Sequence, residues 1–176
     1  MRTRGLVIGK FYPPHRGHKL LIDAALAGAD EVHVIVCARP GENPPADLRA
    51  QWVREIHPTA TVHLLDDRYD ANDSRVWADT CTRLLGFAPD VVFTSEVYGD
   101  PFAACLGCRH VSVDRARTAV PVSGTAVRAD PLAHWEFLEP PVRGFYAKRV
   151  VLIGAESTGK TTLAADLAAA LRTVWV

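Results

Sequence analysis

Short apolar runs rich in Val and Ile alternate with helical patterns through the first two thirds of this 176-residue chain. Runs typical of strands lie at residues 6–9, 32–38, 61–66, 91–95 and 110–114, and helical spacing lies at 18–29, 47–56 and 72–86. Such alternation predicts right-handed βαβ units, and therefore an α/β fold with a doubly wound, parallel five-stranded sheet. In such a sheet, ligands bind beyond the carboxyl ends of the strands, where the strand order reverses.

The charge balance restricts the partners. Lys and Arg number 20, Asp and Glu number 20, and the formal net charge is zero. This balance argues against bulk nucleic acid and against an anionic membrane surface, whereas a small anionic ligand needs only a local basic site. No apolar run approaches the roughly 20 residues that span a bilayer, and the four-residue run near the N-terminus is too short for a signal peptide. We expect a cytoplasmic protein.

The four cysteines are expected to be reduced thiols in such a compartment. Cys105 and Cys108, in CLGC with His110 close behind, have a spacing seen in metal sites. A structural zinc needs four ligands, however, and no second clustered pair is visible. We therefore favour two small residues in a turn, and we expect no protein-held metal.

The stretch GKFYPPHRGH, residues 9–18, directly follows the first predicted strand. Gly9 lets a ligand approach the backbone, and His18 falls in the first turn of the next predicted helix, where free N–H groups favour phosphate. Imidazoles of His15 and His18 over that helix end can donate hydrogen bonds to phosphate oxygens as negative charge grows. Lys10 adds a mobile positive charge beside them.

A second polar cluster, PVSGTAVR, lies at residues 121–128. Ser123 and Thr125 offer hydroxyl donors and can cap a following helix, and Arg128 can clamp phosphate oxygens. Taken alone, this segment also fits an ordinary helix cap with a surface arginine.

Together the two motifs resemble the signatures of the HxGH nucleotidyltransferase superfamily, whose members have a Rossmann-like fold. The first is His15-Arg16-Gly17-His18, and the second is Val122-Ser123-Gly124-Thr125 with Val127 and Arg128. With TSEVYGD (94–100), DRARTAVPVSGTAVR (114–128) and GAESTGKTTL (154–163), the whole chain is similar to the bacterial bifunctional nicotinamide mononucleotide adenylyltransferase/ribosylnicotinamide kinases.

That resemblance implies an enzyme that transfers AMP from ATP to nicotinamide mononucleotide (NMN), giving NAD and pyrophosphate, with Mg²⁺ bridging phosphate oxygens. His15, His18 and Arg128 would act in catalysis. ATP would bind at Gly9, Lys10, Phe11, His15, His18, Ser123, Thr125 and Arg128. Members of the superfamily often form oligomers, so a homo-oligomer is one expectation.

Trp77 follows the third predicted strand. In nicotinamide members of the superfamily a Trp near this place stacks on the pyridine ring, and a cationic ring over an indole face is favourable. The other interpretation is a core residue, since Trp77 is spaced with Cys81 and Leu84 on an amphipathic helix. Asn72 and Asp73 would either neighbour the nicotinamide amide or merely cap that helix.

The segment GAESTGKT (154–161) matches G-x-x-x-x-G-K-[ST], the P-loop. Its Gly154 and Gly159 frame backbone N–H groups, Lys160 would reach the β- and γ-phosphates, and Thr161 would hold Mg²⁺. A predicted strand at 149–154 precedes it. The segment EPPVRGFYAKR, which leads into that strand and contains two prolines and a glycine, is interpreted as a linker.

We therefore divide the chain into an adenylyltransferase domain, 1–145, and the first part of a P-loop kinase domain, 146–176. Because 15 residues follow Thr161, we expect no ribosylnicotinamide kinase activity from the chain as given. The first predicted strand begins within six residues of Met1, and this proximity also argues against a helix-turn-helix and a nucleic-acid partner.

Two alternatives remain open at this stage. One is an adenylyltransferase for another phosphate acceptor, such as flavin mononucleotide or phosphopantetheine. The other is a non-catalytic module that senses nucleotides, against which the retained His15, His18 and Arg128 argue.

Overall fold

The computed structural model describes residues 2–68, 73–171 and 174–175. The chain divides into two compact units, Met1–Tyr146 and Ala147–Val176, and each is described by itself below.

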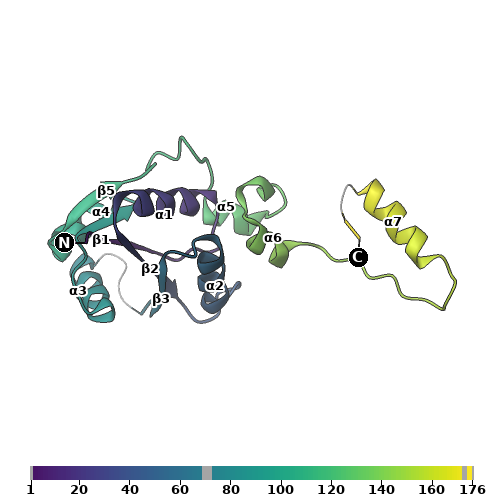
Figure 1. The fold of residues 1–176 in the computed structure, drawn as a ribbon, viewed down its shortest axis with the longest axis horizontal. Coiled ribbons are helices and arrows are strands. Elements are labelled where there is room, and N and C mark those ends of the chain that lie inside the picture. Colours follow the sequence, from purple (N-terminus) through teal and green to yellow (C-terminus); the bar gives the residue numbers. More distant parts are fainter. Residues whose placement is uncertain (1, 69–72, 172–173, 176) are drawn as a thin grey trace. The chain divides into compact units, whose positions relative to one another are not determined.

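The first unit is built on a five-stranded sheet in which every neighbouring pair of strands is parallel. The strands are β1 (Arg4–Gly9), β2 (Glu31–Ala38), β3 (Thr61–Asp66), β4 (Val91–Thr94) and β5 (Arg109–Ser112). Their order across the sheet is β3-β2-β1-β4-β5, so the chain moves outward from β1 on one side and returns to β4 on the other (Figure 1). The predicted doubly wound α/β fold is confirmed.

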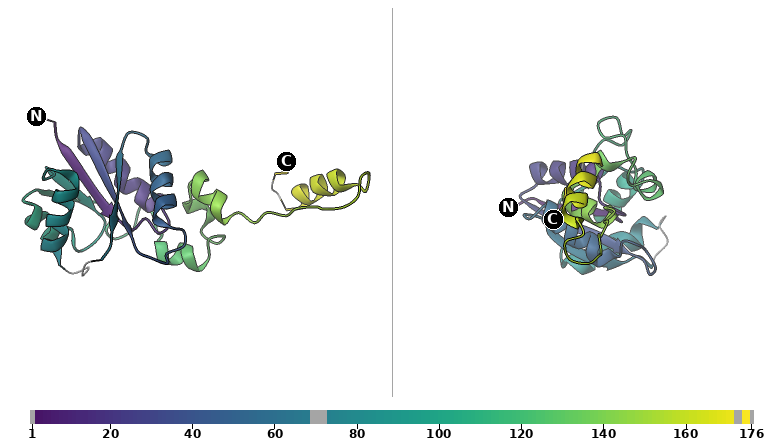
Figure 2. Two further views of the ribbon diagram at one scale, coloured as in Figure 1. Left: turned by 90° about the horizontal axis from the view of Figure 1, so that it is seen from below. Right: turned by 90° about the vertical axis from the view of Figure 1, so that its right-hand side faces the viewer.

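Helices cover both faces of this sheet (Figure 2, left). Helices α1 (Arg16–Gly28) and α2 (Ala46–Ile56) pack on one face, and α3 (Ser74–Leu85) and α4 (Gly99–Leu106) pack on the other. Within β1, Val7 faces the first layer, whereas Leu6 and Ile8 face the second, as the two-residue period of a strand requires. Because both faces are covered, the strands are near-continuous apolar runs rather than alternating ones.

A third apolar cluster joins α2 to the end of the first unit. Trp52 is buried there with Val122, Val127, Leu138 and Val142 and is a core residue. Helix α5 (Gly124–Ala129) supplies Val127, and a 3₁₀ turn (Trp135–Phe137) precedes helix α6 (Pro140–Tyr146).

Two helices of the first unit were not expected from the sequence. The segment taken as a linker contains α6, because prolines are tolerated in the first turn of a helix and Val142 buries its side chain. Helix α4 was not predicted, because it has eight residues and opens on glycine and proline-containing sequence. None of the helices in the described part of the chain is long and apolar enough for a membrane crossing.

The second unit contains α7 (Lys160–Ala170), preceded by an extended segment. The strand predicted at 149–154 is not formed. Within the described residues no strand lies beside it to accept its hydrogen bonds, and Ile153 is 91% exposed. A single run of Val and Ile has high strand propensity, but a strand exists only as part of a ladder.

The four cysteines, all within the described residues, form no disulfide. Cys37 and Cys81 are buried, and burial raises the pKa of each to about 12. Cys105 is exposed and Cys108 is half-buried on either side of Gly107, which ends α4 with a positive φ of 69°. The described residues contain no group of three potential metal ligands.

Gly99 leaves no room for a side chain, because a Cβ there would lie 2.2 Å from His110 Nε2 and 2.3 Å from Thr94 Oγ1. We expect Gly99→Ala to separate Thr94 from His110 and to lower the free energy of unfolding by about 1–3 kcal/mol, the usual cost of overpacking. Urea unfolding measures this. Gly144→Ala is the control, since no atom lies within 4 Å of its added Cβ, and it should leave stability equal or slightly higher.

Candidate functional site

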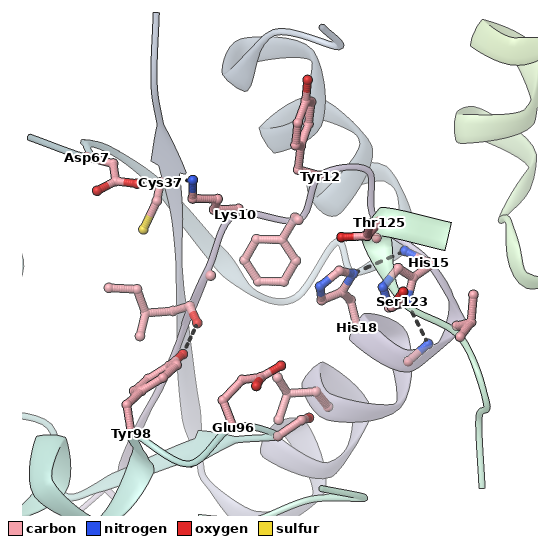
Figure 3. A pocket seen from close by; sticks show the side chains of 18 of the residues that line it. Lys10, Tyr12, His15, His18, Cys37, Asp67, Glu96, Tyr98, Ser123 and Thr125 are labelled. Carbon is pink, nitrogen blue, oxygen red and sulfur yellow. Dashed lines mark hydrogen bonds and ion pairs between the residues drawn. The ribbon is translucent and has the colours of Figure 1, made fainter. Parts of the chain in front are cut away.

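A cavity of about 750 Å³ lies at the carboxyl ends of β1 and β4. These neighbouring strands lead to opposite halves of the sheet, so the cavity occupies the point where the strand order reverses. Figure 3 shows it from close by. Residues from both sequence motifs and from the loops after β2, β3, β4 and β5 line it, among them Gly9, Lys10, Phe11, His15, His18, Arg39, Glu42, Asp67, Trp77, Glu96, Tyr98, Arg117, Ser123, Thr125 and Arg128.

The two histidines stack on each other at the start of α1. Their ring centroids are 3.8 Å apart, and the ring planes are inclined by 30°. His15 is the N-cap residue, and its Nδ1 accepts a hydrogen bond from Gly17 N at 3.2 Å. His18 Nδ1 accepts one from His15 N at 3.3 Å. Gly17 has to be small, because a Cβ there would lie 3.0 Å from the His15 ring.

These contacts fix the tautomers. A backbone N–H donates to each Nδ1, so each neutral ring carries its proton on Nε2. Burial lowers the pKa of His15 to about 4, with a smaller effect of the Arg117 charge. Burial first, and then His15 and Arg117, also lower the pKa of His18 well below its ordinary value. At neutral pH the pair therefore consists of two uncharged rings, each with an Nε2–H available as a donor.

The second motif lies beside the histidines, as Figure 3 shows for Ser123 and Thr125. Ser123 is the N-cap of α5, since its Oγ accepts from Ala126 N at 3.1 Å. Arg128 donates to Tyr12 O at 2.5 Å and to Thr125 Oγ1 at 3.2 Å, and its guanidinium lies 4.5 Å from the centre of the Tyr12 ring. The predicted helix cap is confirmed, and Arg128 ties α5 to the turn after β1.

The opposite wall carries a charge network that sequence reasoning missed. Lys10 Nζ lies 3.4 Å from Glu42 Oε1 and 3.5 Å from Asp67 Oδ2, so it is engaged rather than mobile. Arg39 Nε pairs with Asp67 Oδ2 at 2.6 Å. Arg49 is fully buried; it pairs with Glu42 and donates to the carbonyl oxygens of Lys10 and Cys37. This network closes the cavity where β1, β2 and β3 end.

Trp77 lines the cavity and also packs against the buried cluster of Leu6, Ile8 and Cys81. This packing agrees with the interpretation of Trp77 as a core residue, whereas contact with a nicotinamide ring stays a prediction. Asp73 caps α3 through a hydrogen bond from Val76 N at 3.1 Å and does not line the cavity. Asn72 lies outside the described residues.

Glu96, Tyr98 and Arg117 form the remaining side of the cavity, and sequence reasoning had not singled out any of them individually. Tyr98 donates to Ile8 O at 3.1 Å, and burial raises its pKa. Glu96 Oε1 and Arg117 Nη2 are 3.2 Å apart. The sequence did contain a sign of these residues, because they lie in TSEVYGD and DRARTAVPVSGTAVR, two of the segments that carry the family resemblance.

The predicted phosphate loop, residues 154–161, contains two residues in the left-handed conformation. Ser157 and Gly159 have positive φ, and Gly159 precedes α7. Lys160 Nζ donates to Ala155 O at 2.5 Å, and Thr158 Oγ1 donates to the same oxygen at 2.8 Å. Gly154 and Thr161 lie at the two ends of the loop.

Comparisons with known proteins find relatives in sequence and in fold. The chain is 30% identical over 190 residues to the trifunctional NAD biosynthesis/regulator protein NadR of Escherichia coli (strain K12), covering 95% of this chain and 46% of that protein. It is 34% identical over 109 residues to a probable nicotinate-nucleotide adenylyltransferase of Ruegeria sp. (strain TM1040), covering 57% of this chain and 56% of that one. The chain thus spans about half the length of these relatives.

A solved structure of a NadR protein in complex with NAD and AMP-PNP shares the fold. Its TM-score is 0.74 at 24% identity, covering 97% of this chain and 54% of that one. Separately, residues 149–176 match the family described as "AAA domain".

The depressed pKa of His15 predicts a specific loss of stability in acid. In the unfolded chain His15 binds a proton below the ordinary histidine pKa of about 6.5, whereas in the folded state it binds one only below about pH 4. The folded state therefore loses stability as the pH falls through this window. His15→Asn keeps a capping acceptor and removes the titration. We expect wild type to lose about 1–2 kcal/mol more than this variant between pH 7.5 and pH 5 in urea unfolding. Equal losses in the two proteins would contradict a neutral, buried His15.

Proposed function

We propose that this chain, a homologue of the NadR proteins along almost all of its length, is a nicotinamide-nucleotide adenylyltransferase. It transfers the AMP group of ATP to the 5′-phosphate of NMN, and it releases NAD and pyrophosphate. The observation that carries the proposal is the stacked pair His15 and His18, whose Nδ1 atoms are used by the backbone and whose Nε2–H groups are left as donors at a helix start in the cavity.

The protonation states fit the reaction. The second pKa of a phosphate monoester is about 6, so the attacking phosphate is already an anion near pH 7 and no general base is needed. Its oxygen attacks the α-phosphorus in line, the bond from that phosphorus to the bridging oxygen breaks, and pyrophosphate leaves with the electron pair. What the site must supply is positioning and stabilisation of negative charge. Two neutral imidazoles that donate through Nε2–H meet this need without any proton transfer.

The other walls would hold the rest of ATP. The hydroxyls of Ser123 and Thr125 and the guanidinium of Arg128 would contact the departing pyrophosphate, since a guanidinium binds phosphate oxygens in a bidentate way. Gly9 and Phe11 both line the cavity, so the backbone at the end of β1 would approach the nucleotide. Phe11 is buried with a φ of 48°, a left-handed conformation that turns the chain here.

Mg²⁺ would enter with ATP, held mainly by phosphate oxygens, and would neutralise part of the triphosphate charge. The residues fit this arrangement. The carboxylates on the wall, Glu42 and Asp67, already pair with Lys10, Arg39 and Arg49 and are not grouped as a metal site.

Trp77 is the proposed contact for the nicotinamide ring. It comes from α3, lines the cavity and packs against the buried cluster of Leu6, Ile8 and Cys81. A cationic pyridine ring over an indole face gains cation–π energy. In the second unit, Gly154, Gly159, Lys160 and Thr161 form a proposed phosphate site of their own.

Substitution of His18 tests the catalytic step. His18→Asn keeps an acceptor for His15 N but loses the distal N–H donor. We expect kcat for NAD formation to fall about 10²- to 10³-fold while the Kd for ATP changes less than about threefold, because the lost donor acts on the transition state. His18→Gln extends an amide N–H further out and should recover part of the loss. Equal effects on kcat and on ATP affinity would leave only a binding role for His18.

Substitution of Trp77 tests the acceptor site. Trp77→Ala should raise the KM for NMN about 5- to 30-fold, the loss expected for one desolvated cation–π contact, and leave the KM for ATP near its wild-type value. Trp77→Phe retains an aromatic face and should lie between the two. Steady-state kinetics with each substrate varied in turn give both constants. A parallel rise in both KM values would point to a packing role alone.

A further inference from the structure

We propose that Glu96 restrains Arg117 when ATP is not bound, and that the phosphates of ATP bind Arg117 in place of Glu96. Arg117 is then a phosphate-binding residue outside both sequence motifs, and Glu96 sets its availability. The inference rests on the proposed use of ATP, and it names a competition within the same site.

The loop that carries Arg117 is bound through its backbone by Asp114. Asp114 Oδ1 accepts from Thr118 N at 2.8 Å and from Ala119 N at 3.1 Å, and its Oδ2 accepts from Val120 N at 3.0 Å. These hydrogen bonds lower the pKa of Asp114, and the one from Ala119 N has the largest effect on it. Arg117 itself has a φ of 53°, and its side chain lines the cavity.

Arg117 lines the same cavity as the histidine pair. Its positive charge contributes to the lowered pKa of both His15 and His18, and all three residues line one cavity. A group that binds the donors of this pair therefore comes within the field of Arg117. If that group is a triphosphate, the guanidinium is a natural additional partner, because it offers a planar fork of N–H donors.

Glu96 is fixed from its own side. Thr94 Oγ1 donates to Glu96 O at 3.3 Å and lies 2.9 Å from His110 Nε2. His110 Nδ1 lies 2.7 Å from Asp100 Oδ1, which connects β5 to α4. The backbone of Glu96 is thus anchored at the end of β4, and its carboxylate Oε1 lies 3.2 Å from Arg117 Nη2.

The strength of this ion pair suits an exchange of partners. The side chains of Arg117 and Glu96 are 47% and 51% exposed. For an exposed pair of this kind, the paired state is favoured over the separated side chains by only about 2- to 5-fold. A triphosphate with Mg²⁺ still carries about two negative charges and several oxygens, so it competes effectively with one carboxylate. Glu96, half-exposed, can be solvated by water once its partner has left.

Isothermal titration of ATP with Mg²⁺ into the whole chain, without NMN, tests the proposal. Arg117→Ala should weaken ATP binding about 10- to 100-fold, the usual effect of losing a charge-assisted contact to phosphate. Glu96→Gln keeps the shape of the side chain, and it should tighten ATP binding about 2- to 5-fold by freeing Arg117. Arg115→Ala is the matched control, since Arg115 is exposed on the same loop and does not line the cavity; it should stay within about twofold of wild type.

The double variant distinguishes a restraint from simple repulsion. If Glu96 acts by holding Arg117, then Glu96→Gln added to Arg117→Ala should bring no further change in Kd. An equal tightening in both backgrounds would mean that Glu96 merely repels ATP, and it would overturn the proposal. An unchanged Kd in Arg117→Ala would overturn it too.

The outcome is separable from the proposed function. A wild-type chain that forms NAD but gives a flat set of Kd values would contradict the exchange and leave the adenylyltransferase proposal standing. The expected set of Kd values without NAD formation would support the exchange and contradict the choice of acceptor.

Discussion

The first free amide groups of α1 are bound by two imidazole rings, and the chemistry of the cavity depends on that choice. A serine or aspartate would cap the helix equally well. With histidine, the capping contact uses Nδ1 of His15 and of His18, so the proton of each ring has to lie on Nε2. Burial of each ring, together with the close approach of the two rings at 3.8 Å, then keeps both neutral. A structural contact thus yields two oriented donors at the helix end where an anion is best stabilised.

Two arginines from other helices hold the turn that leads into α1. Arg49 is buried without solvent contact, and its guanidinium joins Lys10 O, Cys37 O and Glu42. A buried charge is tolerable only with such partners. Arg128 binds Tyr12 O from the other side, so two arginines fix the turn between β1 and α1. Gly124 permits this approach, because a Cβ there would lie 2.7 Å from Tyr12 O.

Much of the first unit follows from the sequence, because its information is local. The five strands were predicted to within two residues at each end, since each is a short apolar run between turn residues. His15, His18, Ser123 and Arg128 were found because each motif is continuous in the chain. Arg39, Glu42, Asp67, Glu96 and Arg117 were not found, because they meet only after parallel strands bring separate loops to one edge.

The errors have the same origin. The strand predicted at 149–154 depends on neighbours that the run itself does not encode, and α6 depends on burial of Val142 against the third apolar cluster. The proposed domain boundary, the role of Asn72 and the binding roles of the site residues stay predictions.

The central claim is adenylyl transfer to NMN at the histidine pair. Phosphorus NMR of the pure chain with ATP, Mg²⁺ and NMN follows it directly, since every bond that changes contains phosphorus. The account predicts that the NMN monoester signal is replaced by the diphosphate of NAD, with one pyrophosphate released for each NAD formed. Persistence of the monoester signal under conditions in which ATP is shown to bind would contradict it.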